Sequence, residues 1–190
     1  ELYKDGYLVR YPDKKKPYEM GEYVETKKLL ATFDEYEDIY RLLNVHTVHK
    51  LNQKVEDGTI NDFILLSEAL HEKKISILAD KICRRKNVKM VLIAGPSSSG
   101  KTTFARKLSL ALRLNGLTPV TISVDNYFVE RSDTPKDEFG NYDFECIEAI
   151  DLDLFNDHLV KLLNGETIEV PKFDFKVGTK RYDGTTMSLG

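Results

Sequence analysis

Two absences narrow the classes of protein to which this 190-residue chain can belong. Its only cysteines are Cys83 and Cys146, too few for the disulfide framework of a small secreted domain. The longest apolar run, residues 90–94, is far too short to span a bilayer, and the first residues lack the apolar stretch of a signal peptide. We therefore expect a cytoplasmic protein without a membrane partner.

The net charge of the chain is also small. The chain has 28 Lys and Arg residues against 31 Asp and Glu residues, which gives a formal charge of −3 at pH 7. A value so close to zero argues against bulk nucleic acid as the main partner. With 41% hydrophobic and 31% charged residues, the composition is that of a globular protein that can bury a core. The length predicts one or two small domains.

Residues 1–86 are predicted to form a first domain that is extended at its start and then helical. Residues 27–33 read as a strand. Asp34, with Glu37 three residues later, predicts a capping box at the start of a helix. Asn61 predicts the cap of a second, longer helix, because apolar residues recur after it at helical spacing.

Residues 87–190 are predicted to form a second domain of the α/β class. The continuous apolar run 88–94 is typical of a buried strand of a parallel sheet. An amphipathic helix over 101–114 and a second apolar strand over 120–124 complete a strand–helix–strand unit. Further elements are a helix over 149–163 and a strand over 167–170. The sequence therefore predicts a parallel sheet of the P-loop kinase type, preceded by a mostly helical segment.

A phosphate-binding loop lies between the first predicted strand and its helix. Its eight residues are Gly95, Pro96, Ser97, Ser98, Ser99, Gly100, Lys101 and Thr102. They match the pattern G-x-x-x-x-G-K-[ST], in which glycines let successive N–H groups point at phosphate oxygens. Lys101 can reach the β- and γ-phosphates of a triphosphate, and the Thr102 hydroxyl can coordinate Mg²⁺. The loop predicts ATP and Mg²⁺ as cofactors, bound by these residues and Thr103.

An acidic residue follows the second predicted strand. Asp125 lies at the carboxyl end of residues 120–124, where ligands bind in open α/β sheets. A carboxylate there can accept the proton of an attacking hydroxyl group, or it can contact Mg²⁺ through water. Tyr127 and Phe128 come next, and they can either stack on a flat substrate or pack beneath the loop. Asp125 and Lys101 are the predicted catalytic residues.

These motifs together resemble the uridine kinase/phosphoribulokinase family. The resemblance covers residues 88–190 and rests on four segments in order. They are residues 95–103, 123–128, 142–145 and 171–175. It implies a kinase that transfers a phosphoryl group from ATP to a hydroxyl of a small molecule, with Asp125 as general base. A nucleoside is the favoured acceptor, a phosphoribulokinase-like small alcohol is the alternative, and self-association is left open.

The resemblance also implies a substrate site. Phe128 would lie at the nucleoside, Phe144 would supply a ring, and Glu145 would bind the ribose in place of the usual, shorter aspartate. Phe173 and Phe175 match the Pro-x-Tyr-Asp-Phe motif, with Phe in the place of Tyr. Their rings favour a planar base over a bare sugar phosphate.

The chain departs from the family pattern in other places. Uridine and cytidine kinases carry a base-reading histidine where this chain has Gly178. A third core strand with an acidic residue and an Arg-rich lid are expected after Gly190, so we expect this segment alone to have little turnover. Residues 1–86 resemble the region that precedes the kinase in bacterial uridine-kinase-like proteins, whose first modules are similar to threonyl-tRNA synthetase. A nucleotide-binding regulatory module without kinase activity is the competing hypothesis.

Overall fold

The structure is a computed structural model that describes residues 2–3 and 6–189. Contacts divide the chain into two compact units, residues 1–65 and 66–190. The division falls inside one long helix, α3 (Ile60–Arg84). The division into compact units does not test the domain boundary that the sequence predicts between residues 86 and 87, so this boundary stays a prediction.

The first unit contains a short strand pair and two helices. Strands β1 (Leu2–Tyr3) and β2 (Gly6–Tyr7) pair antiparallel. Helix α1 spans Lys27–Leu42 and helix α2 spans Val48–Glu56. Thr47 caps α2, because its side chain accepts a hydrogen bond from the Lys50 N–H at 3.2 Å. Neither helix has a buried residue, so this unit has little core of its own.

The strand predicted over residues 27–33 is wrong, and so is the helix start at Asp34. Both lie within α1, which begins at Lys27. Lys, Leu and Ala at the start of α1 are good helix formers, and the Glu37 carboxylate pairs with Arg41 one turn later. Asn61 is likewise the second residue of α3 and not its cap.

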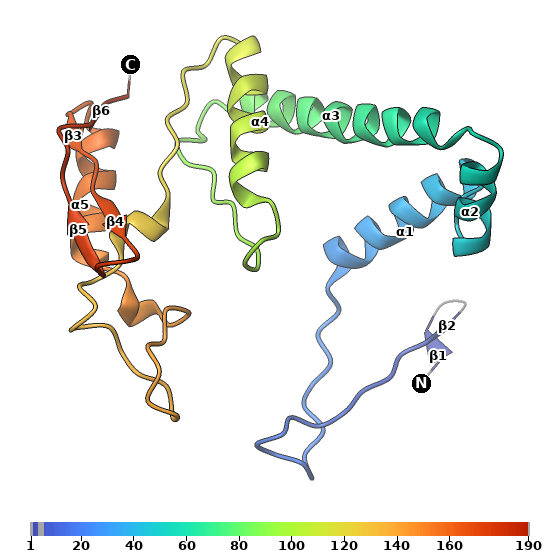
Figure 1. The fold of residues 1–190 in the computed structure, drawn as a ribbon, viewed down its shortest axis with the longest axis horizontal. Helices are drawn as coiled ribbons and strands as arrows, with labels where there is room; N and C mark the ends of the chain where they lie inside the picture. The colour runs from blue at the N-terminus through green and yellow to red at the C-terminus, as the bar shows by residue number, and fades with distance from the viewer. Residues whose placement is uncertain (1, 4–5, 190) are drawn as a thin grey trace. The chain divides into compact units, whose positions relative to one another are not determined.

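In the second unit, the later part of α3 packs against helix α4 (Lys101–Leu114). Ile75 and Ala79 of α3 form a buried cluster with Leu108 and Leu112 of α4. Two polar contacts join the same helices. Lys107 pairs with Glu72, and the Asn115 side chain donates to Asp80 at 2.9 Å. Helix α3 is therefore part of the support for the helix that carries the phosphate-binding loop (Figure 1).

The two strands predicted over 88–94 and 120–124 are absent from the structure as described. Every strand pair among the described residues is antiparallel, so the mixture of helix and strand is α/β without the predicted parallel sheet. A strand needs a neighbour for its N–H and C=O groups, and neither segment has a ladder partner here. Ile93 instead packs its side chain against the α3–α4 cluster, while Leu92 is 81% exposed.

The rest of the second unit is a bent antiparallel ribbon with one helix beside it. Strand β3 (Ile168–Glu169) pairs with β6 (Thr186–Met187), and β4 (Lys172–Asp174) pairs with β5 (Thr179–Arg181). Buried Pro171 interrupts the ladder between the two pairs, because it has no N–H to donate.

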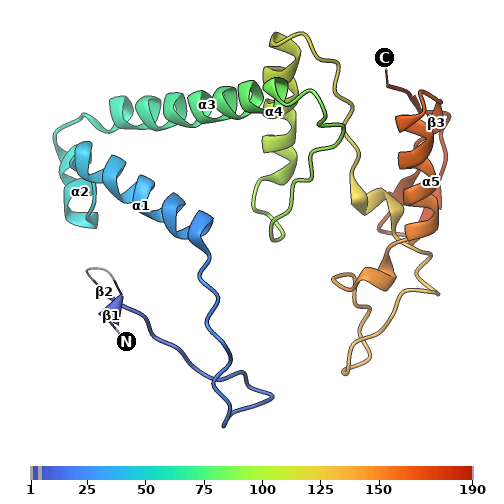
Figure 2. The ribbon, with the colours of Figure 1, turned by 180° about the vertical axis from the view of Figure 1, so that it is seen from behind.

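Helix α5 (Leu152–Leu163) lies along this ribbon in two opposite views (Figures 1 and 2). Its Leu162 packs with Ile168 and Val170 of the ribbon. The ends of α4 and α5 are as predicted, since both stop at Asn-Gly pairs whose glycines, Gly116 and Gly165, have positive φ. No helix in residues 2–3 or 6–189 has both the length and the hydrophobicity to cross a membrane.

Candidate functional site

The predicted phosphate-binding loop has the backbone of an anion cradle. Ser98 has a φ of 58° and Gly100 a φ of 85°, so two left-handed residues flank Ser99. Alternating handedness of this kind turns successive N–H groups toward one concave side. The turn is closed by a hydrogen bond of 3.3 Å from the Ser99 N–H to the Pro96 carbonyl.

The loop leads directly into α4, and the start of that helix is left open. Gly100 is the N-cap residue and gives no side-chain cap, and the first turn has no acidic residue. The N–H groups of its first turn and the positive end of the helix dipole therefore point out of the helix start. Figure 2 shows the loop at this end of α4. This arrangement attracts an anion.

Lys101 is the cation of this loop. Its Nζ donates hydrogen bonds to the Gly95 carbonyl at 2.8 Å and to the Pro96 carbonyl at 2.9 Å. The side chain thus turns back over the loop instead of extending along the helix. A Cβ on Gly95 would lie 2.9 Å from the Ser99 Oγ, so a side chain there would require the Ser99 hydroxyl to rotate away.

A nucleoside triphosphate fits this chemistry, and Mg²⁺ fits in part. The loop offers backbone donors, one ammonium group and the hydroxyls of Ser97, Ser98, Ser99, Thr102 and Thr103, all of which are exposed. Thr102 is the hydroxyl that the sequence assigns to Mg²⁺. No group of three His, Cys, Asp or Glu side chains converges on a metal position in the described parts of the chain. The protein alone would thus give Mg²⁺ few ligands, which suits an ion that enters bound to phosphates.

Asp125 lies on η1 (Val124–Tyr127), a short 3₁₀ turn after the predicted second strand. Its side chain is exposed, whereas Tyr127 on the same turn is fully buried. A carboxylate in this position can reach a ligand in solution. Tyr127 packs beneath the turn, so of the two roles open to it the structure favours packing.

The predicted substrate aromatics form one cluster beside η1. The Phe128 ring lies at the centre, with centroid distances of 5.2 Å to Phe144, 5.5 Å to Phe173 and 6.0 Å to Phe175. Phe128 and Phe173 are only 8% and 7% exposed, whereas Phe175 is 56% exposed. The first two rings are core residues in this structure, and Phe175 presents the accessible ring.

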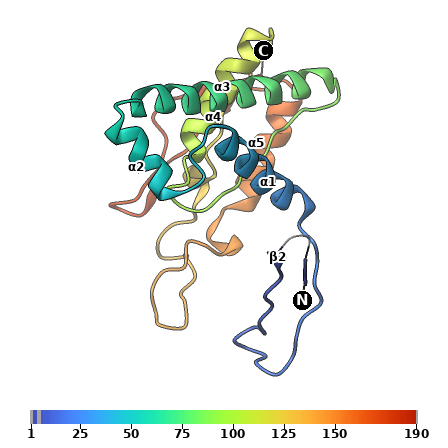
Figure 3. The same ribbon diagram turned by 90° about the vertical axis from the view of Figure 1, so that its right-hand side faces the viewer.

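Glu145 lies next to this cluster on an exposed loop, and its N–H donates to the Asp143 carboxylate at 3.0 Å. Figure 3 shows the long loop between η1 and α5 that carries Phe144 and Glu145. The structure therefore brings Asp125, the aromatics and Glu145 into one region through η1 and the ribbon. No hydrogen bond or ion pair among the described residues joins this region to the phosphate-binding loop.

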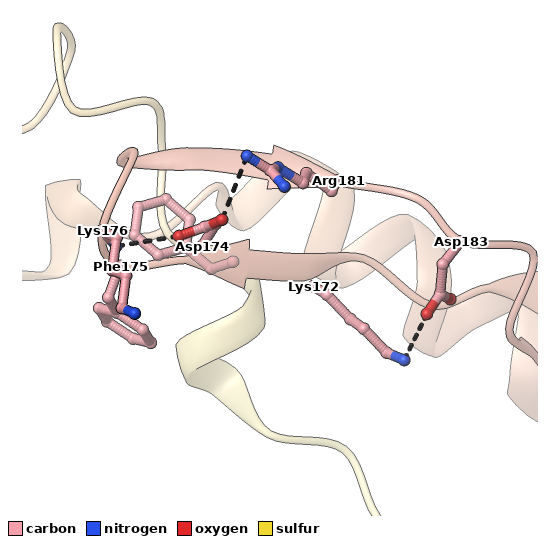
Figure 4. Close-up of a pocket in the computed structure, with 7 residues that line it drawn as sticks. Lys172, Asp174, Phe175, Lys176, Arg181 and Asp183 are labelled. Atoms are coloured by element: carbon pink, nitrogen blue, oxygen red, sulfur yellow. Dashed lines mark hydrogen bonds and ion pairs between the residues drawn. The ribbon is translucent and has the colours of Figure 1, made fainter.

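A shallow cavity of about 600 Å³ opens on the β4–β5 hairpin (Figure 4). Phe173 and Phe175 line it together with charged residues, most of which are paired. Lys172 pairs with Asp183 at 2.5 Å and Arg181 pairs with Asp174 at 3.2 Å. Hydrogen bonds from Lys172 and Thr185 hold the pKa of Asp183 at about 2. The lining thus has three basic residues against two aspartates, and two of the three basic residues are in ion pairs.

Gly178, the position of the missing base-reading histidine, is buried under the side chain of Arg131. The Arg131 guanidinium donates to the Phe175 carbonyl at 2.5 Å and the Lys176 carbonyl at 3.4 Å, and its backbone N–H donates to the Gly178 carbonyl at 2.9 Å. A Cβ on Gly178 would lie 2.6 Å from Arg131 Nε and 2.7 Å from its Cβ. The structure thus leaves no room for a side chain at this position.

We expect Gly178→Ala to destabilise the protein more than Gly140→Ala does. Both glycines have a φ of +82°, but a Cβ on Gly140 meets no atom within 4 Å. Backbone strain of about 1–2 kcal/mol is common to both variants. The collision with Arg131 adds about 1–3 kcal/mol for Gly178 alone. Urea unfolding of the two variants measures the difference, and equal losses would contradict the packing described here.

Asp151 joins α5, η1 and β5. Its carboxylate caps α5 by accepting from the Leu154 N–H at 3.1 Å and pairs with the Lys180 ammonium, while its N–H donates to the Tyr127 carbonyl at 2.8 Å. Burial alone would raise the pKa of Asp151, but the hydrogen bonds from Lys180 and Leu154 outweigh it and lower the pKa below its usual value.

This lowered pKa predicts a loss of stability in acid. A carboxylate with a lowered folded pKa contributes stability above its unfolded pKa of about 4, and this is lost as the pH falls through the folded value. Asp151→Asn, which keeps a capping side chain but leaves Lys180 unpaired, is expected to cost about 1–3 kcal/mol at pH 7. It should also flatten the stability profile below pH 4. Unfolding of this variant and of the exposed control Asp153→Asn across pH 2–7 tests both points, and parallel profiles would contradict them.

Several residues of the region escaped sequence reasoning. No motif marks Arg131, Asp151 or His158, and each contacts a segment distant in the sequence: Arg131 the β4–β5 hairpin, Asp151 both Lys180 and Tyr127, and His158 the Tyr127 hydroxyl. Asp174 carried a weak signal, since it lies between the two motif aromatics. Its pKa is lowered chiefly by the Val177 N–H, with burial acting against this, and the Lys176 N–H and Arg181 add to the effect.

Comparison with known proteins agrees with the motifs. A model of the family described as "Phosphoribulokinase / Uridine kinase family" matches residues 90–187. A uridine kinase of Halobacterium salinarum is 34% identical over 91 residues, which cover 48% of this chain and 39% of that protein. For a uridine kinase of Deinococcus deserti the identity is 34% over 98 residues, covering 52% and 46%. A uridine kinase of Schizosaccharomyces pombe is 37% identical over 92 residues, covering 47% and 20%. The chain spans less than half the length of these curated relatives.

Proposed function

The chain belongs to the phosphoribulokinase/uridine kinase family, and we propose that its protein transfers the γ-phosphoryl group of ATP to a hydroxyl of a small acceptor. A nucleoside is the favoured acceptor. The observation that carries the proposal is the loop of residues 95–102, whose left-handed turns, open helix start and Lys101 suit a triphosphate. The three relatives compared above are uridine kinases, which agrees with the proposal.

In this proposal Lys101 and the loop N–H groups bind the β- and γ-phosphates. They stabilise the negative charge that develops as the bond between the γ-phosphorus and the β-bridging oxygen breaks. Mg²⁺, bound to the phosphates and to the Thr102 hydroxyl, would supply further charge neutralisation. The Ser97, Ser98, Ser99 and Thr103 hydroxyls lie around the same phosphates. ADP is the leaving group.

Asp125 would act on the acceptor. Its carboxylate takes the proton of the attacking hydroxyl while the new oxygen–phosphorus bond forms, so the products are ADP and a phosphate monoester. Its exposed place on η1 leaves it accessible to such a hydroxyl. The proposal requires residues 88–94 and 120–124, which form no strands in this structure, to pair as parallel strands so that the loop and Asp125 meet at one sheet edge.

The cavity on the β4–β5 hairpin favours a neutral acceptor with a flat ring. Phe175 offers an exposed ring there, and Lys172 and Arg181 are already neutralised by aspartates. A sugar phosphate, the acceptor of the phosphoribulokinase-like alternative, would compete with these aspartates for Lys172 and Arg181, which leaves Lys176 as the one basic residue of the lining without an ion pair among the described residues. Phe144 and Glu145 are the proposed further contacts of the acceptor, and Phe128 and Phe173 would support them from the core.

The test is phosphoryl transfer from labelled ATP with Mg²⁺, using the full-length protein and a panel of nucleosides, small alcohols and sugar phosphates. We expect transfer to one nucleoside, and we expect Asp125→Asn to lower its rate by about 10²–10⁴-fold with ATP affinity unchanged. Asp153→Asn, an exposed carboxylate on α5, is the matched control. Tight ATP binding without transfer to any acceptor would contradict the kinase proposal and favour the nucleotide-binding regulatory module.

A further inference from the structure

Tyr127 and His158 form a buried polar pair to which no role has been given. Tyr127 is 0% exposed and His158 is 7% exposed, and the Tyr127 hydroxyl lies 3.0 Å from His158 Nδ1. The Tyr127 ring also meets Phe155 edge to face at 5.0 Å. An apolar phenyl ring would fill the same space without a buried hydroxyl to satisfy. Packing alone therefore does not require the Tyr127 hydroxyl, whose structural role is the hydrogen bond to His158.

Burial disfavours the charged form of both members of the pair. Burial raises the pKa of Tyr127 and lowers the pKa of His158. A neutral imidazole accepts at Nδ1 in one tautomer and donates there in the other, and the Tyr127 hydroxyl can take the complementary role in either case. The bond ties the Tyr127 side chain of η1 to His158 of α5.

The pair fixes more than one side chain, because Tyr127 ends the turn that carries Asp125. Three other bonds hold the same short segment. The Asp151 N–H donates to the Tyr127 carbonyl at 2.8 Å, the Val129 N–H donates to the Ala149 carbonyl at 2.9 Å, and the Phe173 N–H approaches the Asn126 side chain at 3.5 Å. Of these contacts, only the bond to His158 involves the Tyr127 side chain.

The geometry of a 3₁₀ turn links the two side chains. With about three residues per turn, residues two apart point in different directions, and here Tyr127 points inward while Asp125 is exposed. A rotation of η1 that releases Tyr127 from His158 must also redirect Asp125. We propose that Tyr127 and His158 are positioning residues that hold the Asp125 carboxylate toward the acceptor hydroxyl. This inference rests on the proposed role of Asp125.

The test uses the full-length protein with Tyr127→Phe, which removes one hydroxyl and keeps the ring. Tyr182→Phe is the matched control, because it removes a hydroxyl from a half-exposed tyrosine after β5. His158→Leu removes the hydrogen-bonding partner of Tyr127, and His158→Asn keeps a group that can donate or accept near the Nδ1 position. The two readouts are amide hydrogen exchange over residues 123–128 and the steady-state kinetics of phosphoryl transfer.

We expect Tyr127→Phe and His158→Leu to speed exchange over residues 123–128 and to lower kcat by about 10–100-fold, with the KM for ATP unchanged. His158→Asn should recover part of kcat, and Tyr182→Phe should match the unmodified protein. Unchanged exchange in Tyr127→Phe would overturn the inference whether or not the protein transfers phosphate. Faster exchange with unchanged kcat would overturn it as well. If even the unmodified protein transfers nothing, the kinase proposal fails and so does the positioning role that depends on it.

Discussion

Lys101→Met is expected to lower phosphoryl transfer by about 10²–10³-fold or more. The variant keeps the length and apolar stem of the side chain but removes the only cation within the loop of residues 95–102. The charge that develops on the transferring group would then lose its closest ammonium donor. ATP affinity should fall too, since the ground-state triphosphate interacts with the same group. Initial rates with Mg²⁺ and ATP, together with calorimetric ATP binding, measure the two effects.

Lys107→Met provides the control for this experiment. It removes a cation from the same helix and breaks only a surface ion pair with Glu72, worth about 0–1 kcal/mol. Lys101 also bonds to the carbonyls of Gly95 and Pro96, so both variants need an unfolding curve to show that α4 is intact. Transfer by Lys101→Met within tenfold of the unmodified rate would mean that this loop does not serve the transferring phosphate.

Phe173→Ala is expected to cost about 3–5 kcal/mol of unfolding free energy. Phe173 is 7% exposed and lies in a cluster with Phe128 and Ala149, so its removal leaves a cavity between the ribbon and η1. Phe175→Ala should cost less than about 1 kcal/mol, because its ring is 56% exposed and leaves little cavity. The two variants remove the same ring from neighbouring positions of one hairpin.

Phe173→Ala is expected to have the larger effect on stability, whereas Phe175→Ala is expected to show a direct effect on acceptor binding. Phe175→Ala, which stays folded, is expected to raise the KM for the acceptor by about tenfold, the equivalent of one stacking contact. Its effect on the KM for ATP should be small. Urea unfolding and acceptor titrations of the two variants test the assignment. Equal losses of stability would show that the burial difference between the two rings does not govern their energetics.

The parts that sequence predicted well are those with local signals. Helix α4 is preceded by its N-cap Gly100 and followed by Asn115-Gly116, and each of these residues acts on its own backbone. The phosphate-binding loop is equally local. The strands over 88–94 and 120–124 depend instead on partners distant in the chain, and an apolar run does not specify a partner. Residues 27–33 show the same weakness, because their apolar and basic residues suit a helix as well as a strand.

In the candidate site, too, local motifs were predictable from the sequence and contacts between distant segments were not. Motif positions identified the aromatic residues, but not that Phe128 is buried at the centre of the cluster while Phe175 is exposed. That distinction arises from the return of the ribbon onto η1, about 45 residues later in the chain. The packing of Arg131 over Gly178 was equally unpredictable, because it depends on a contact between two residues that are distant in the sequence.

The continuity of α3 affects how the part of the chain that matches the family, residues 90–187, could be produced alone. The helix is continuous from Ile60 to Arg84, so the change from one compact unit to the other occurs without a loop. A truncation at residue 87 would strip Ile75 and Ala79 from Leu108 and Leu112, leaving the inner face of the loop-bearing helix open to water. A truncation at the turn of Asp57 and Gly58, where the backbone leaves α2, would keep α3 whole. We expect limited proteolysis to cleave at the same exposed turn.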